Sequence, residues 1–191
     1  MKRIIKNNIN TKIYWDRLLK NGKWGEERGS IYNKLSKYFP KKRKITAVDI
    51  GCAVGHGLIE LANKLKNVKF EGCDFSKEGI KQAKKLYGSK INFFVHDVYE
   101  DSLDKKYDYI LFVETLEHID NPKKIIKKYL KYCNKKMLVT VPYKEGGKRK
   151  WEEHLYYFDE KSFKDIKEFK KYFIFKKFNT EQKIILYLFE K

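Results

Sequence analysis

Short apolar runs rich in β-branched residues alternate along this chain with amphipathic stretches of helical spacing. This alternation predicts a mostly parallel sheet covered by helices on both faces, because parallel strands need a crossover segment between them. The expected strands are residues 44–50, 68–75, 91–96, 107–113, 136–141, 172–179 and 183–190. The expected helices are residues 56–66, 76–87, 121–133 and 159–171. The last two strands are joined by a tight link and should form an antiparallel hairpin at one edge of a doubly wound, seven-stranded α/β sheet.

The 191 residues fit one structural domain. Residues 1–43 have a helical pattern of their own and are expected to form a cover segment over the ligand crevice. Residues 44–191 would form the main domain. Trp15 and Trp24 lie in the cover segment, where they either stack on a ligand or pack in the core.

Composition and cysteine spacing predict in which cellular compartment the protein works. The chain has no run of about 18 apolar residues that could cross a membrane. Its first residues turn polar at once, unlike a secretory signal. Cys52, Cys73 and Cys133 have no CxxC spacing and predict reduced thiols in a cytoplasmic protein.

The formal net charge is +19, yet only five of the 44 basic residues are arginine. A surface selected for phosphate binding would use more arginine forks, so we interpret the excess mainly as a lysine-rich solvated surface. A nucleic-acid partner stays open as the weaker alternative.

Acidic residues follow three consecutive expected strands. Asp49 ends the first strand and precedes a glycine-rich turn, residues 51–57. Asp74 ends the second strand, where a carboxylate can bind both hydroxyls of a ribose. Asp97 ends the third strand and is placed to bind the exocyclic amine of a base. The carboxylate of Asp49 would repel a phosphate but suits a ligand with a cationic group, such as an ammonium or sulfonium.

The segments VDIGCAVG (48–55), GCDFS (72–76), DV (97–98) and YDYILFVETLEHI (107–119) together resemble the class I S-adenosylmethionine-dependent methyltransferases. The resemblance runs from residue 44 to the end of the chain. It implies a Rossmann-like fold whose last strand inserts antiparallel between the fifth and sixth, and S-adenosylmethionine as cofactor. The implied donor-binding residues are Asp49, Gly51, Cys52, Ala53, Gly55, Asp74, Phe75, Asp97, Val98 and Glu114. Ala53 stands where many members of the family have glycine. Arg28 lies in the cover segment, where it could either pair with the methionine carboxylate or lie on the surface.

Glu114, Glu117 and His118 are spaced i, i+3, i+4 and would share one face if the segment after the fourth strand is helical. His154 follows the next strand end. We expect His118 and His154 to be catalytic, because a hydroxyl acceptor must lose a proton. With Glu114 and Glu117 they could also hold a divalent metal. This pattern resembles that of metal-using methyltransferases of small-RNA 3′ ends and of catechols. His56 and His96 are expected to be structural.

The sequence therefore predicts an S-adenosylmethionine-dependent methyltransferase that methylates a hydroxyl of a small molecule or sugar. Two alternatives stay open at this point. One is an RNA 2′-O-methyltransferase, and the other is a non-catalytic subunit that binds the donor and regulates a partner.

Overall fold

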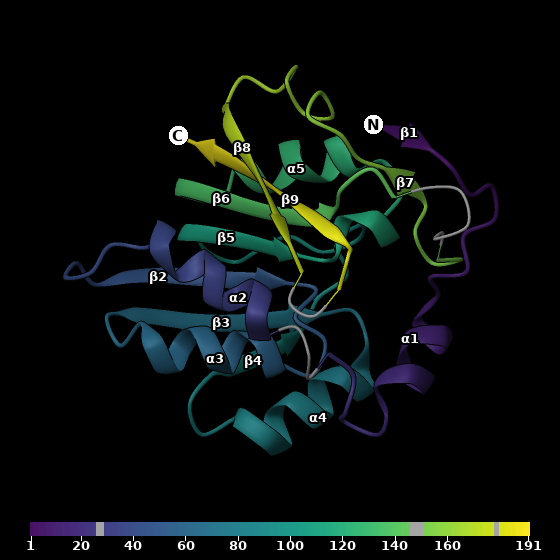
Figure 1. The fold of residues 1–191 in the computed structure, drawn as a ribbon. Helices are drawn as coiled ribbons and strands as arrows, with labels where there is room; N and C mark the ends of the chain where they lie inside the picture. The colour runs from purple at the N-terminus through teal and green to yellow at the C-terminus, as the bar shows by residue number, and fades with distance from the viewer. Residues whose placement is uncertain (26–28, 146–150, 178–179) are drawn as a thin grey trace.

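The computed structural model describes residues 1–25, 29–145, 151–177 and 180–191. Its centre is a seven-stranded sheet of order β4-β3-β2-β5-β6-β9-β8 (Figure 1). The strands are β2 (Ile45–Ile50), β3 (Val68–Asp74), β4 (Asn92–Val95), β5 (Tyr107–Val113), β6 (Cys133–Pro142), β8 (Phe169–Lys176) and β9 (Lys183–Glu190). The first five pair in parallel, and β9 runs antiparallel between β6 and β8. The predicted doubly wound α/β fold with an antiparallel C-terminal strand is confirmed.

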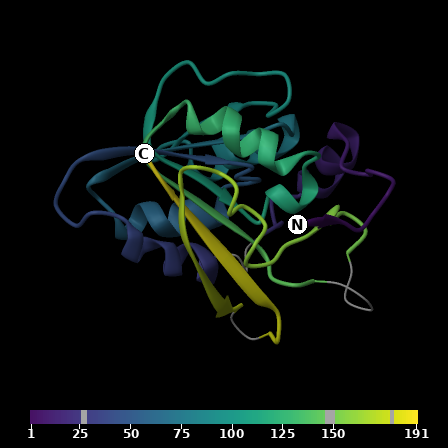
Figure 2. The ribbon, with the colours of Figure 1, turned by 90° about the horizontal axis from the view of Figure 1, so that it is seen from above.

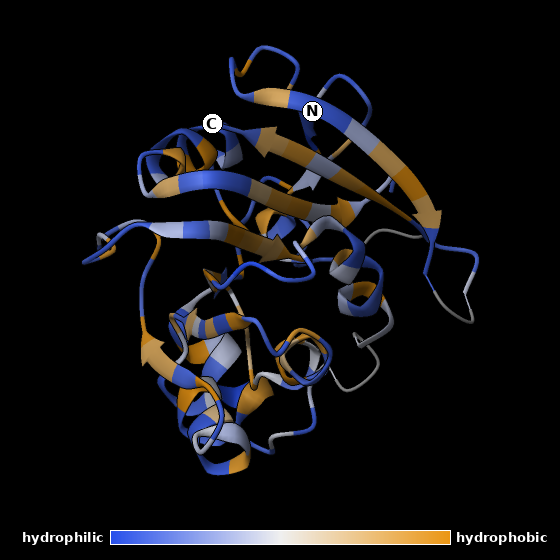
Figure 3. Cartoon of the chain, turned by 90° about the vertical axis from the view of Figure 1, so that its left-hand side faces the viewer, coloured by the Kyte–Doolittle hydropathy of each residue, from blue (hydrophilic) through white to orange (hydrophobic). Residues whose placement is uncertain are grey.

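Helices cover both faces of this sheet (Figure 2). On one face lie α2 (Gly29–Leu35), α3 (His56–Lys64) and α4 (Lys77–Tyr87), and on the other lies α5 (Pro122–Leu130). The central strands carry runs of hydrophobic residues (Figure 3), and alternate side chains of each strand enter the two cores. For example, Leu111 packs in the first core and Phe112 in the second. No helix in the described parts of the chain has the length and apolarity to cross a membrane.

The N-terminal region occupies three places. Helix α1 (Lys12–Leu19) lies beyond the carboxyl ends of the strands (Figure 1), whereas α2 and the short 3₁₀ helix η2 (Ser36–Tyr38) pack on the sheet face beside α3. Strand β1 (Lys2–Arg3) pairs antiparallel with β7 (Tyr156–Tyr157). Of the described part of the expected cover segment, α1 and its neighbours reach the crevice through Asn10, Trp15, Leu19 and Trp24, whereas α2 and η2 do not line it.

The helix expected over residues 159–171 is wrong. The segment forms successive turns with hydrogen bonds from Ser162 to Asp159 and from Ile166 to Phe163, and β8 begins at Phe169. The Asp159 carboxylate accepts hydrogen bonds from the Lys161 amide and the Ser162 hydroxyl. These local bonds compete with helical ones. The spacing of three between buried Phe163 and Ile166 suits such turns as well as a helix.

Candidate functional site

A pocket opens at the carboxyl edge of the sheet, at the point where strand order reverses between β2 and β5. This is where doubly wound sheets bind ligands. It holds about 670 Å³ of non-atom space, its open mouth included, which is a usual size for a small-molecule site. Residues that follow four strands line it, together with residues of the N-terminal region: Asn10, Trp15, Leu19, Trp24, Gly51, Ala53, Asp74, Phe75, His96, Asp97, Val98, Tyr99, Glu114, Thr115, His118 and Ile119.

The turn after β2 brings backbone close to the ligand space. Gly51 has φ +82°, and a Cβ there would lie 2.3 Å from the Cγ2 atom of Thr115, so only glycine fits. Ala53 also has a positive φ, +51°. This left-handed conformation costs glycine nothing, whereas the side chain of alanine makes it less favourable.

Asp74 joins this turn to β3. Its Oδ2 accepts a hydrogen bond from the Ala53 amide at 3.0 Å, and its Oδ1 accepts one from the Ser76 amide at 2.9 Å. The carboxylate is therefore held in one orientation at the pocket wall, although it is only 7% exposed. Ser76 also caps α4, as the sequence predicted, by accepting from the Gly79 amide.

Asp97 is the second acid of the pocket wall. Its Oδ1 accepts from the Tyr99 amide, and Lys12 of α1 forms an ion pair with its Oδ2 at 3.0 Å. Burial by itself raises the pKa of Asp97, but the Tyr99 amide and Lys12 outweigh it and hold this pKa below its ordinary value. Asp97 is thus an anion that ties α1 to the pocket.

Three of the predicted donor-binding residues do not line the pocket. Asp49 is fully buried, and its Oδ2 accepts a hydrogen bond from the Tyr32 hydroxyl at 2.6 Å. Cys52 is buried in the core of the α3 face. Gly55, with φ +83°, is the N-cap of α3. These residues shape the turn from behind, whereas the other seven line the pocket.

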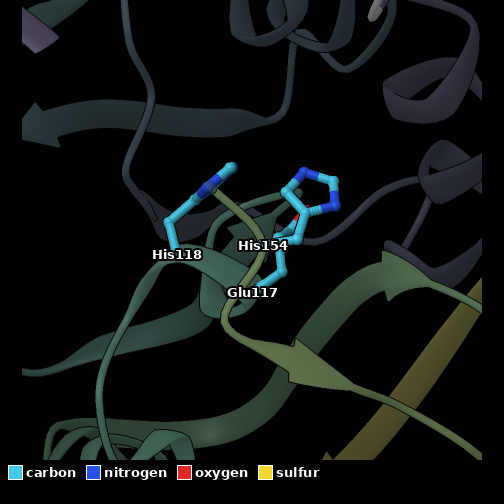
Figure 4. Close-up of side chains that lie close together, drawn as sticks. All are labelled: Glu117, His118 and His154. Carbon is cyan, nitrogen blue, oxygen red and sulfur yellow. The ribbon is translucent and has the colours of Figure 1, made fainter. Parts of the chain in front are cut away.

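A second group of side chains lies next to the pocket. One ligand atom each of Glu117, His118 and His154 lies within 4.8 Å of the others (Figure 4). The backbone brings them together, because the Leu155 amide donates to the Glu117 carbonyl at 2.7 Å. His118 belongs to both the pocket and this cluster.

The helix expected to align the two glutamates with His118 does not form. After β5, Glu114 adopts φ +53°, and only the short 3₁₀ helix η3 (Leu116–His118) follows. Glu114 lines the donor pocket but stands outside the group formed by Glu117, His118 and His154. Of the four residues predicted to bind a metal, the structure therefore brings together Glu117, His118 and His154, and Glu114 stays apart from them.

Hydrogen bonds fix where each of the two clustered imidazoles carries its proton. The Nδ1 atom of His118 lies 3.1 Å from the Glu153 carbonyl oxygen, which can only accept. The Nδ1 atom of His154 pairs with the Glu145 carboxylate. Both rings therefore carry a proton on Nδ1, and in the neutral form the lone pair is on Nε2.

The other two histidines behave differently. His56 begins α3, and its two ring nitrogens contact the Tyr87 hydroxyl and the Gly22 carbonyl, each at 2.6 Å. These contacts agree with a structural role. His96 pairs with the Tyr129 hydroxyl at 2.5 Å, and burial lowers its pKa. It also lines the pocket, although we expected it to be structural.

Sequence reasoning missed several residues of the site. Asn10, Tyr99 and Thr115 line the pocket, and Glu145 contacts His154. Thr115 and Tyr99 could have been found, because each lies a few residues after the end of a strand, β5 and β4 respectively. Asn10 and Glu145 depend on contacts with other segments and left no local signal. Arg28 lies outside the described residues.

The fold and pocket define a doubly wound protein with a nucleoside-sized site at its strand ends. Residues 24–176 match the family model for a methyltransferase domain, so the chain belongs to that family, within the class I S-adenosylmethionine-dependent methyltransferases.

The curated relatives support the family assignment, but their names give different reactions. The chain is 35% identical over 100 residues to (S)-tetrahydroprotoberberine N-methyltransferase of Eschscholzia californica, a match of 50% of this chain and 29% of the plant enzyme. It is 30% identical over 139 residues to carboxy-S-adenosyl-L-methionine synthase of Campylobacter curvus, covering 70% of this chain and 54% of that enzyme. The matches thus span about a third to a half of those proteins.

Solved structures show the same fold. The plantazolicin methyltransferase BpumL in complex with S-adenosylhomocysteine aligns with a TM-score of 0.67 at 18% identity, over 96% of this chain and 91% of BpumL. Coclaurine N-methyltransferase, bound to N-methylheliamine and S-adenosylhomocysteine, aligns with a TM-score of 0.60 at 15% identity, over 91% and 55%.

Proposed function

We propose that this chain transfers a methyl group from S-adenosylmethionine to a hydroxyl oxygen of a small molecule or sugar. The donor would occupy the pocket at the carboxyl ends of β2 to β5. Gly51 and Ala53 would lie against its methionine part, and Asp74 would accept hydrogen bonds from its ribose hydroxyls. Phe75, Asp97 and Val98 would surround its adenine. The family match and the placement of these residues on one pocket wall support this assignment.

The observation that favours an oxygen acceptor is the pair of imidazoles beside the pocket. Their ring centroids lie 4.8 Å apart, and each ring has its proton on Nδ1. A neutral amine already offers a lone pair to the methyl group. A hydroxyl becomes a good nucleophile only when its proton is removed. Either His118 or His154 would accept that one proton through Nε2 as the oxygen attacks the methyl carbon and the sulfonium leaves as a neutral thioether.

The same side chains make a chemically suitable donor set for a divalent cation. One carboxylate and two imidazoles are ligands that Zn²⁺, Mn²⁺ and Fe²⁺ accept. Each imidazole also donates its other N–H to an oxygen, as metal-bound histidines do. We therefore propose Glu117, His118 and His154 as the residues that would hold a metal. When bound, such an ion would lower the pKa of an acceptor hydroxyl.

The test is a panel of hydroxyl acceptors, with production of S-adenosylhomocysteine as the signal. Catechols and vicinal diols come first, with the matched amines and an RNA 3′ end in parallel, each in EDTA and in added Mg²⁺, Mn²⁺ or Zn²⁺. Turnover with a hydroxyl compound supports the proposal. Turnover with amines alone, or with RNA alone, contradicts it.

A further inference from the structure

A buried carboxylate stands behind the histidine cluster. Glu145 follows β6 and is 9% exposed, and its side chain reaches His154. It is neither a member of the cluster nor part of the pocket lining among the described residues. No motif in the neighbouring sequence predicted a functional role for Glu145. Its contact with His154, nine residues further along the chain, is visible only in the structure.

The geometry points to Glu145 as a positioning residue for His154. Its Oε2 accepts the Nδ1 proton of His154, and the Gln182 amide nitrogen lies 3.4 Å from its Oε1. The carboxylate is therefore held from two sides, by the ring it orients and by Gln182, which directly precedes β9. A carboxylate in this position selects the His154 tautomer that keeps the lone pair on Nε2.

This selection serves either form of the proposed chemistry. A general base and a metal ligand both need an unprotonated ring nitrogen, and free imidazole can place its proton on either nitrogen. His118 reaches the same tautomer through the Glu153 carbonyl, which also accepts from Asn10 at 2.9 Å. The two rings thus have the same proton arrangement from two different acceptors. The catalytic importance of Glu145 rests on the proposed function, whereas its hold on the tautomer does not.

The test compares Glu145→Ala with Glu145→Met, which keeps the side chain's length, and with Glu145→Gln, whose amide oxygen can still accept. Glu160→Gln is the matched control, because it removes a carboxylate that contacts Tyr143 and Lys144 instead. Long-range ¹H–¹⁵N spectra of the histidine rings report the tautomer in the ligand-free protein, and His154→Gln assigns the His154 signals.

We expect the Nδ1–H tautomer of His154 in the wild type, in Glu145→Gln and in Glu160→Gln. In Glu145→Ala and Glu145→Met the Nε2–H form should become the main species. With an accepted hydroxyl compound, these two variants should lose turnover about 10- to 100-fold, as for other residues that orient a functional histidine. Affinity for S-adenosylhomocysteine should not change.

An Nε2–H tautomer in the wild type would overturn the inference, as would an unchanged tautomer in both Glu145→Ala and Glu145→Met. The wild-type spectrum needs no variant to fold. If the tautomer shifts as expected but no hydroxyl compound is methylated, the proposed function fails while the positioning by Glu145 stands.

Discussion

The Tyr32 hydroxyl donates a hydrogen bond to Asp49 Oδ2 across 2.6 Å, and both side chains are buried. Tyr32 belongs to α2, and Asp49 lies near the end of β2, just before the glycine-rich loop. This contact connects the N-terminal helices to the backbone that forms the pocket. Asp49 therefore acts behind the donor site, whereas the sequence suggested that it contacts the donor.

Loss of this hydrogen bond should destabilise the fold. Tyr32→Phe should lower the free energy of unfolding by about 1–3 kcal/mol, because it removes a donor from a buried carboxylate. Tyr38→Phe, which removes a hydroxyl from the neighbouring η2, is the control and should have a smaller effect. Urea denaturation measures both variants, and equal losses would contradict the role of the contact.

Substitution of Gly57 should also destabilise the fold, because Gly57 packs against the same Tyr32 ring. A Cβ at this position would lie 2.1 Å from Cε2 of Tyr32, so the ring must move for alanine to fit. Gly57→Ala should therefore destabilise the protein by about 1–3 kcal/mol, as overpacked cores do. Combining it with Tyr32→Phe should cost less than the sum of the two single losses, since displacing the ring already breaks its bond to Asp49. Strict additivity in urea denaturation would count against this coupling.

Asp74 should determine donor affinity. Asp74→Asn should weaken binding of S-adenosylhomocysteine about 10- to 100-fold, the effect of losing charge-assisted hydrogen bonds to two hydroxyls. Asp104→Asn changes an exposed carboxylate of the loop before β5 and should leave affinity unchanged. Isothermal titration measures both. Because Asp74 also accepts from two backbone amides, a melting curve must show that the variant is folded. Wild-type affinity in folded Asp74→Asn would remove Asp74 from the donor site.

Substitution of His154 should reduce methyl transfer without changing donor binding. His154→Ala should reduce methyl transfer about 10²- to 10⁴-fold, the range for loss of a general base, while S-adenosylhomocysteine affinity stays within a factor of two or so. His56→Gln changes an imidazole whose contacts are to Tyr87 and Gly22, and it should keep wild-type turnover. Unchanged turnover in His154→Ala, measured with an accepted hydroxyl compound, would show that His154 has no part in the reaction.

The ionised Glu71 carboxylate should make the free energy of unfolding decrease at acid pH. Burial by itself raises the pKa of Glu71, but hydrogen bonds from Lys105 and Tyr107 outweigh it, so this pKa lies below its ordinary value. Its contribution to stability is present above the unfolded pKa of about 4.3 and is lost as pH falls through the lower folded pKa. Tyr107→Phe should cost about 2 kcal/mol at pH 7, and the difference from wild type should shrink below about pH 4.

The control for this pH dependence is Tyr132→Phe. Tyr132 packs near Tyr129, so its variant removes a hydroxyl from the same region without touching Glu71. We expect it to change the free energy of unfolding by less than about 0.5 kcal/mol at any pH in this range. A loss in Tyr107→Phe that stays constant from pH 7 to pH 3 would show that its hydroxyl does not stabilise an ionised Glu71.

The sheet could be predicted because its signals are local. Strands such as β2 and β5 are mostly apolar runs, and α4 has both a cap at Ser76 and a regular apolar stripe. The prediction of a helix at 159–171 is wrong because Asp159 accepts local hydrogen bonds that form turns, and residue spacing alone does not reveal them. Asn121 occupies the N-cap position of α5, as expected, but with φ +55° and without a side-chain capping bond.

The donor side of the site was predictable for the same reason as the sheet. Asp74 ends β3, Phe75 follows it, and Asp97 comes soon after β4, and parallel strands end at one edge. The acceptor side depends on contacts that join distant segments. The Leu155 amide donates to the Glu117 carbonyl and so brings Glu117 beside His154, and Glu145 contacts His154 from the end of β6. Such pairings depend on the path of loops, which periodicity does not encode.

The most direct test of the account is isothermal titration of the wild-type protein with S-adenosylhomocysteine in the presence of EDTA. We predict one site per chain with micromolar affinity, because the pocket residues need no metal to bind the nucleoside. Repeating the titration with Mn²⁺ or Zn²⁺ should leave this affinity unchanged, and a separate metal-binding event should disappear in His118→Ala. Absence of S-adenosylhomocysteine binding in folded protein, with or without metal, would contradict the assignment of the pocket as the methyl-donor site.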